Sequence, residues 1–181
     1  MIRWGLDGDR VVLRIGDDSA AVIRALLEEL TALIRGRMRP YGTVLTTPED
    51  PALARLFPDP VRGDDFEAID VRTITEPSLI AHRLLNVRAV LESLDAPGPL
   101  DDAQELAWLK TLTDLRLVLA VRLGIERDGD EGRDGTEEDR RMRDVYDWLG
   151  ATQARLLDVL LIRGPVQRPV VGPIDEPEPD A

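Results

Sequence analysis

The acidic stretch DGDEGRDGTEED, residues 128–139, is the segment whose composition most resembles a metal site, because seven of its twelve residues carry carboxylates. A calcium loop of the EF-hand type needs oxygen ligands at its first, third and fifth positions, a glycine at the sixth and a glutamate at the twelfth. A frame that starts at Asp128 has Gly132 at the fifth position, and a frame that starts at Asp130 has Arg141 at the twelfth. Neither frame fits. We therefore expect a flexible, solvated connection between two helices.

Other residue types that carry chemistry are scarce. The chain has no cysteine and a single histidine, so disulfides, thiolate metal sites and cysteine nucleophiles are excluded. His82 lies off the apolar stripe of its predicted helix, and we interpret it as exposed or hydrogen-bonded. Ser19, Ser78 and Ser93 lie at predicted helix caps or surfaces, without a nucleophile motif or a phosphate loop. We expect no catalytic residue, no cofactor and no metal.

The charge balance bears on the class of partner. A formal net charge of −12 disfavours direct binding to nucleic acid, which depends on neutralising phosphates. Two arginine clusters are local exceptions to the acidic charge of the chain. They are RGRMRP at 35–40 and RRMR at 140–143. The first is interpreted as cations at the negative end of a helix dipole. The second is interleaved with Glu138, Asp139 and Asp144, which are expected to pair with it along a helix.

The N-terminal residues show no basic start followed by an apolar run. The most apolar stretch, which begins at Leu115, is interrupted by Arg116 and Arg122. We therefore expect no signal peptide, no membrane span and a cytoplasmic protein.

The 181 residues suit one domain with a real core. The pattern predicts a mainly α fold, a helical bundle of about five to six helices with a short N-terminal β-hairpin. Alternating apolar residues on both sides of Asp7–Asp9 predict the hairpin, which should lean on helices because an isolated hairpin is marginal in water. Residues 1–164 are expected to form a single helical domain, and residues 165–181 an acidic, proline-rich disordered tail.

Apolar residues with helical spacing predict the bundle. The first helix is capped by Asp17 or Asp18, and a short helix follows a start signal at Thr47. Two separate helices are expected next, at 64–72 and from Pro77 to about residue 94. The helix expected at 101–125 is apolar nearly all round past Leu112 and should be buried, and the last helix runs from about 137 to 162.

Two segments carry a family resemblance, ELAWLKTLTDLRLVLAVRLGI at 105–125 and VYDWLGATQARLLDVLL at 145–161. Together with the leading hairpin and PALARLFP at 51–58, they resemble an actinobacterial family of domains of unknown function that includes an oxidative-stress regulator. The resemblance implies a helical fold and a regulatory rather than catalytic protein. It also implies a protein partner, such as a sigma factor or another transcription component. A redox-sensing disulfide cannot form in this chain.

The matching segments contain the candidate site residues. Trp108, Tyr146 and Trp148 are expected on two facing helices, either as core anchors or as the lining of a partner-binding groove. Asp114 or Asp147 is expected to neutralise Arg116 or Arg122 inside the bundle.

The sequence thus favours a non-enzymatic regulatory protein in transcription or stress response that acts through protein–protein interaction. A DNA-binding transcriptional regulator and a carboxylate-based enzyme are the alternatives. The sequence also allows a homodimer.

Overall fold

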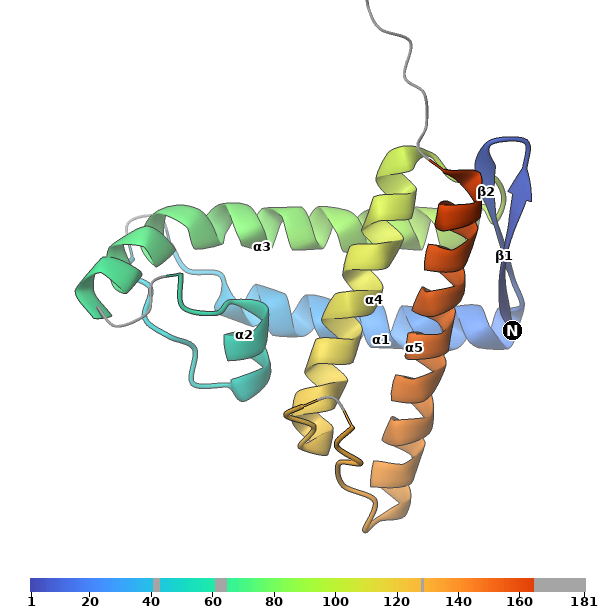
Figure 1. Ribbon diagram of the computed structural model, residues 1–181. Helices are drawn as coiled ribbons and strands as arrows, with labels where there is room; N and C mark the ends of the chain where they lie inside the picture. The colour runs from blue at the N-terminus through green and yellow to red at the C-terminus, as the bar shows by residue number, and fades with distance from the viewer. Residues whose placement is uncertain (41–42, 61–64, 128, 165–181) are drawn as a thin grey trace, which may run out of the picture.

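A computed structural model of the chain describes residues 1–40, 43–60, 65–127 and 129–164. The described part is mainly helical, as expected, with two strands and five helices. The elements are β1 (Ile2–Asp7), β2 (Arg10–Ile15), α1 (Asp17–Arg37), α2 (Pro51–Leu56), α3 (Asp65–Asp95), α4 (Asp102–Leu123) and α5 (Glu137–Arg163). In Figure 1, α1 and α3 run side by side as one layer, and α4 and α5 cross in front of them as a second. The tail predicted for 165–181 lies outside the described residues.

The N-terminal hairpin is confirmed. β1 and β2 pair antiparallel with Asp7 opposite Arg10, so the turn consists of two residues. Gly8, the first of them, has φ +62°. This is the position at which a type II′ turn needs a glycine. The hairpin leans on helices, since the Trp4 indole Nε1 donates to the Thr152 carbonyl of α5 at 3.0 Å.

The segment between α3 and α4 covers the outer edge of β2. The Leu13 N–H donates to the Gly98 carbonyl at 2.8 Å, and the Leu100 N–H donates to the Val11 carbonyl at 2.7 Å. An isolated bridge also joins Val12 and Pro99. The edge strand is therefore paired along part of its length instead of being open to another chain.

The helix starts differ from the predicted caps at two places. Gly16 is the N-cap of α1, and no side chain caps it, so Asp17 and Asp18 lie within the first turn. There their charges face the positive end of the helix dipole. The cap of α2 is Asp50 rather than Thr47, because the Asp50 carboxylate accepts from the N–H groups of Ala52 and Leu53.

The prediction of two helices at 64–72 and 77–94 was wrong, since α3 is one helix from Asp65 to Asp95 with Pro77 inside it. Residue 64 lies outside the described residues. A proline inside a helix removes one backbone hydrogen bond and costs about 3 kcal/mol or more. Buried contacts on both sides of the proline, through Arg72, Glu76 and Ile80, offset this cost. Figure 1 shows α3 bending toward its N-terminal end and then running straight.

The bounds predicted for the two C-terminal helices are confirmed to within a few residues. Asp101 and Gln104 form a capping box at the start of α4, and Gly124 ends it in the left-handed conformation with φ 70°. Thr136 and Asp139 form a capping box at the start of α5, and Gly164 follows its last residue. Both boxes satisfy backbone donors that a helix start otherwise leaves free.

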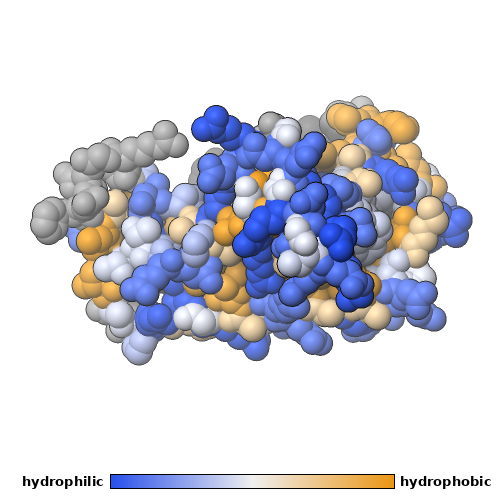
Figure 2. Space-filling model, turned by 90° about the horizontal axis from the view of Figure 1, so that it is seen from below, coloured by the Kyte–Doolittle hydropathy of each residue, from blue (hydrophilic) through white to orange (hydrophobic). Residues whose placement is uncertain are grey.

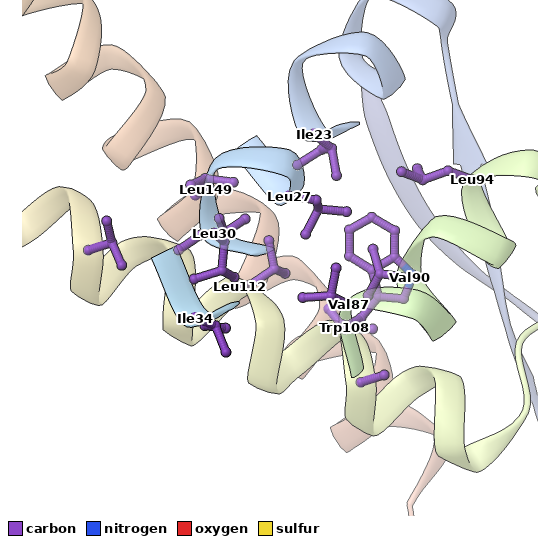
Figure 3. Packing of buried hydrophobic residues seen from close by; sticks show 14 of the residues in the cluster. Ile23, Leu27, Leu30, Ile34, Val87, Val90, Leu94, Trp108, Leu112 and Leu149 are labelled. Carbon is purple, nitrogen blue, oxygen red and sulfur yellow. The ribbon is translucent and has the colours of Figure 1, made fainter. Parts of the chain in front are cut away.

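The core lies where the two helix layers meet. Figure 3 shows side chains from α1, α3, α4 and α5 converging on one another, with Trp108 beside Val87 and Val90. The predicted stripes of α1 and α3 supply much of it, and α4 is buried over most of its surface, as expected. Among the described helices, none is long and apolar enough to span a bilayer.

Candidate functional site

The structure places the seven residues predicted as candidate site residues on α4 and α5, but it does not bring all of them together. They are Trp108, Asp114, Arg116 and Arg122 on α4, and Tyr146, Asp147 and Trp148 on α5. Only Arg116 and Tyr146 of this set line the same hollow. The others belong to the core, to an ion pair with another helix, or to the exposed surface.

Trp108 is a core residue with 1% of its surface exposed. Its indole Nε1 donates to the Ser93 hydroxyl at 2.9 Å, and the ring meets the edge of Trp4 with centroids 5.1 Å apart. Ser93 itself is buried and donates to the Val90 carbonyl, which contradicts its predicted place at a cap or surface. The reason is that the indole N–H needs an acceptor once the ring is buried.

The α5 members of the set have different surroundings. Trp148 is half-buried and packs against the core, Tyr146 is half-buried, and Asp147 is exposed. The Arg116 guanidinium lies 5.0 Å above the centre of the Tyr146 ring. This distance is within the range for a cation–π contact.

The expected pairing of Asp114 or Asp147 with Arg116 or Arg122 was wrong. Asp114 accepts from Arg83 of α3, and burial raises the pKa of the Asp114 carboxyl while Arg83 opposes the shift. Arg122 pairs with Glu29 of α1 at 3.1 Å. The cause is geometric, because α4 packs against α1 and α3 as well as α5.

A buried ion cluster between α1 and α3 was missed by sequence reasoning. Arg37 and Arg72 both donate to the Glu76 carboxylate, and Arg37 also donates to the Thr46 carbonyl. Arg72 further donates to Asp59, and this hydrogen bond lowers the pKa of the Asp59 carboxyl. The i,i+4 spacing of Arg72 and Glu76 was the one signal in the sequence.

The two arginine clusters are largely engaged within the protein. Arg35 and Arg37 lie in the last turn of α1, as the dipole interpretation expected, although Arg37 is also buried in the ion cluster. Arg39 donates to the Gly36 carbonyl near the end of α1. Arg141 pairs with Glu137 rather than with the acids first expected, and Arg140 donates to the Asp134 carbonyl. These contacts leave fewer guanidinium groups for phosphates.

Two carboxylates of the acidic stretch also have backbone partners. Asp130 accepts from the N–H groups of Glu126 and Arg127, both at 2.9 Å, and Asp139 accepts from that of Thr136. His82 is exposed and its Nδ1 lies 2.7 Å from the Ser78 carbonyl oxygen, which confirms the interpretation of this residue.

A hollow of about 200 Å³ opens beside α4 and α5 and is called here the arginine pocket. Its charged and aromatic lining consists of Arg55, Arg116, Glu126, Arg127 and Tyr146. These residues come from α2, α4, α5 and the connection that follows α4. Among the described lining residues, three arginines stand against one glutamate, so this lining is cationic in a chain whose net charge is −12.

The contact line between α4 and α5, called here the α4–α5 seam, continues from this pocket toward exposed leucines. Gln153 spans the seam, since its side-chain amide donates to the Thr113 hydroxyl at 2.7 Å. Leu106 lies seven residues before Thr113, and Leu157 lies four residues after Gln153. These spacings return to the same helix face, so both leucines lie along the seam at the same end. Leu161 follows Leu157 by one turn.

These leucines are exposed to solvent. Leu106 is 49% exposed, Leu157 44% and Leu161 78%. Seen from below, the surface of the molecule is mostly hydrophilic in the middle, with hydrophobic residues toward its edges (Figure 2). The α4–α5 seam therefore runs from a cationic pocket toward exposed leucines.

The described residues thus form a mainly helical bundle with a cationic hollow beside α4 and α5. The match to known families is direct: residues 1–160 fit a family described as a domain of unknown function, DUF2017. The chain belongs to this family, as the resemblance of its segments implied.

Several relatives carry functional names. The protein named oxidative stress regulator AosR in Mycobacterium tuberculosis is 30% identical over 151 residues, which cover 75% of this chain and 66% of that protein. The protein of the same name in Mycobacterium bovis matches equally. A Mycobacterium leprae protein whose name also carries AosR is 31% identical over 130 residues, or 63% of this chain and 60% of its own length. The chain thus spans slightly less than two thirds of these relatives. No solved structure matches it.

Proposed function

We propose that the chain is a non-enzymatic regulatory protein that acts by binding a protein partner at the apolar end of the α4–α5 seam. The names of the relatives support a regulatory role. The observation that supports binding is the exposure of Leu106, Leu157 and Leu161 on one face of two packed helices. Exposed apolar side chains favour association, because their transfer out of water is favourable.

The partner's surface must be apolar where it meets these leucines. The resemblance points to a component of the transcription machinery, with a sigma factor as the first protein to test. A partner that contributes a hydrophobic helix would lie along the seam and place its apolar side chains against the exposed leucines of α4 and α5. The polar residues around the leucines would then form the rim of the interface.

The charged groups argue for binding rather than catalysis. Asp114 is the buried carboxyl whose pKa is raised, and it accepts from Arg83 between α3 and α4. It does not line the arginine pocket. General acid–base chemistry needs such a group within reach of a substrate, and an ion pair between packed helices stabilises the fold instead.

The experiment compares single aspartate substitutions. Leu157→Asp and Leu161→Asp should abolish retention of the partner from an actinobacterial extract and its binding once purified, because a charge at an apolar interface must be desolvated. Leu85→Asp is the matched control, since Leu85 is 59% exposed on α3. It should retain the partner.

Circular dichroism must show that all three variants keep the helicity of the parent. Retention of the same partner by Leu157→Asp and Leu161→Asp would contradict the proposal. The absence of any specifically retained protein with the parent chain would contradict it as well.

A further inference from the structure

The arginine pocket carries an inference that is independent of the proposed protein partner. We propose that this pocket binds a small ligand bearing an oxyanion, either a carboxylate or a phosphate group. The ligand would lie between Arg55 of α2, Arg116 of α4 and Arg127 of the connection that follows α4. Guanidinium groups bind such anions in pairs of parallel hydrogen bonds, which is why arginine is favoured at carboxylate and phosphate sites.

Arg116 is held in place before any ligand arrives. One of its terminal nitrogens donates to the Gln153 side chain at 2.9 Å and the other donates to the Tyr146 hydroxyl at 3.3 Å. Its Nε is buried and has no hydrogen-bond partner within the described part of the chain. The ring of Tyr146 lies beneath the guanidinium. A cation fixed in this way loses little side-chain freedom when it binds an anion.

The guanidinium of Arg116 has more donors than these contacts use. An arginine side chain has five N–H groups and no acceptor, and the hydrogen bonds just described use two of them. Tyr146 accepts from Arg116, so its own hydroxyl hydrogen is free to donate toward the hollow. An oxyanion in the arginine pocket would accept from the unused terminal N–H groups of Arg116 and from the Tyr146 hydroxyl, whereas the buried Nε is out of its reach.

The other two arginines are exposed and weakly bound. Within the described residues, Arg55 donates only a long bond, 3.4 Å, to the backbone carbonyl of Glu126. The side chain of Arg127 bonds to none of the residues that the structure describes, although its backbone N–H donates to Asp130. Glu126 is the acidic residue in the lining. The lining therefore keeps an excess of positive charge that an anion would neutralise.

The size of the pocket limits the ligand. Its volume of about 200 Å³ is below the range of roughly 300–1,000 Å³ typical of drug-sized ligand sites. Leu117, Ala120 and Ile125 supply an apolar part of the wall. A small organic anion with a short apolar body, or inorganic phosphate, matches this volume and lining.

The test is isothermal titration calorimetry of the purified chain with two probes, inorganic phosphate and succinate, at a constant ionic strength set with sodium chloride. At least one probe should bind saturably with one site per chain. Arg127→Gln and Arg55→Gln should each weaken that binding about tenfold or more, because each removes a charged donor. Both residues are exposed, so the variants should fold.

Arg88→Gln is the matched control, since Arg88 is an exposed arginine on α3 that pairs with Glu92 outside the pocket. It should bind the probe as tightly as the parent. The inference is overturned if neither probe binds saturably, if both pocket variants bind as tightly as the parent, or if Arg88→Gln weakens binding equally. The titration uses the isolated chain, so failure of the partner proposal would leave its result unchanged.

Discussion

Arginine side chains have opposite surroundings in two regions of this molecule. In the ion cluster between α1 and α3, Arg37 and Arg72 are buried and donate to Glu76 and to backbone carbonyls. In the arginine pocket, Arg55 and Arg127 are exposed, and acceptors for their N–H groups are few within the described residues. A guanidinium whose N–H groups have acceptors within the protein stabilises the fold. One whose N–H groups lack acceptors leaves a surface able to bind a ligand.

The largest effect on stability should come from the buried core. Trp108→Ala should destabilise the protein by about 3–5 kcal/mol, because it leaves a cavity and removes the donor to the buried Ser93 hydroxyl. Trp148→Ala should cost less, since Trp148 is half-buried. Urea denaturation followed by circular dichroism measures both. Equal losses for the two variants would show that the two helices share one core more evenly than the burial indicates.

The ion cluster should be next in size. Glu76→Gln keeps the shape of the side chain but replaces charged acceptors for Arg37 and Arg72, and should cost about 1.5–3 kcal/mol. Glu92→Gln is the control, because its pair with Arg88 is exposed and such pairs contribute about 0–1 kcal/mol. Thermal unfolding of the two variants in parallel tests the contrast. Similar melting temperatures would mean that burial does not strengthen the cluster.

A smaller effect, of opposite sign, is expected at the seam. Gly150→Ala should stabilise the protein by about 0.5–1 kcal/mol, because alanine favours the helix interior. A Cβ at residue 150 would lie 3.4 Å from the Arg116 Nε, an ordinary contact. Urea denaturation measures the change. A loss of stability would reveal that Arg116 packs against α5 with no room to spare.

A thiol oxidant should have the smallest effect and should leave both arginine regions unchanged. Diamide should change neither the helicity nor the assembly state of the purified chain, because the sequence has no cysteine. Size-exclusion chromatography and circular dichroism with and without diamide provide the check. A reproducible shift would require a chemistry other than disulfide exchange.

The spacing of apolar residues along the sequence was enough to predict the helices that bury one face. The spacing of Ile23, Leu27 and Leu30 predicted the face of α1 that enters the core, and all three are buried. The hairpin followed from its alternating residues and its turn. The continuity of α3 did not, because a proline stops most helices, yet Pro77 lies inside this one.

The site was harder to predict for a related reason. The partners of the charged residues lie far away in the chain, as Arg37 does from Glu76 and Arg83 does from Asp114. Local spacing carries no information about such pairs. The family segments did indicate Arg116 and Tyr146, but the contribution of Arg55 and Arg127 depends on how α2 and the connection after α4 pack.

The position of the hairpin has a consequence for the order of events during synthesis. A two-stranded hairpin alone is marginal in water. The backbone groups that support this one, at Gly98, Leu100 and Thr152, are translated long after it. The hairpin must therefore wait until residues as far as Thr152 have been made before it gains these neighbours. The hairpin should consequently gain its native packing only after α5 has emerged.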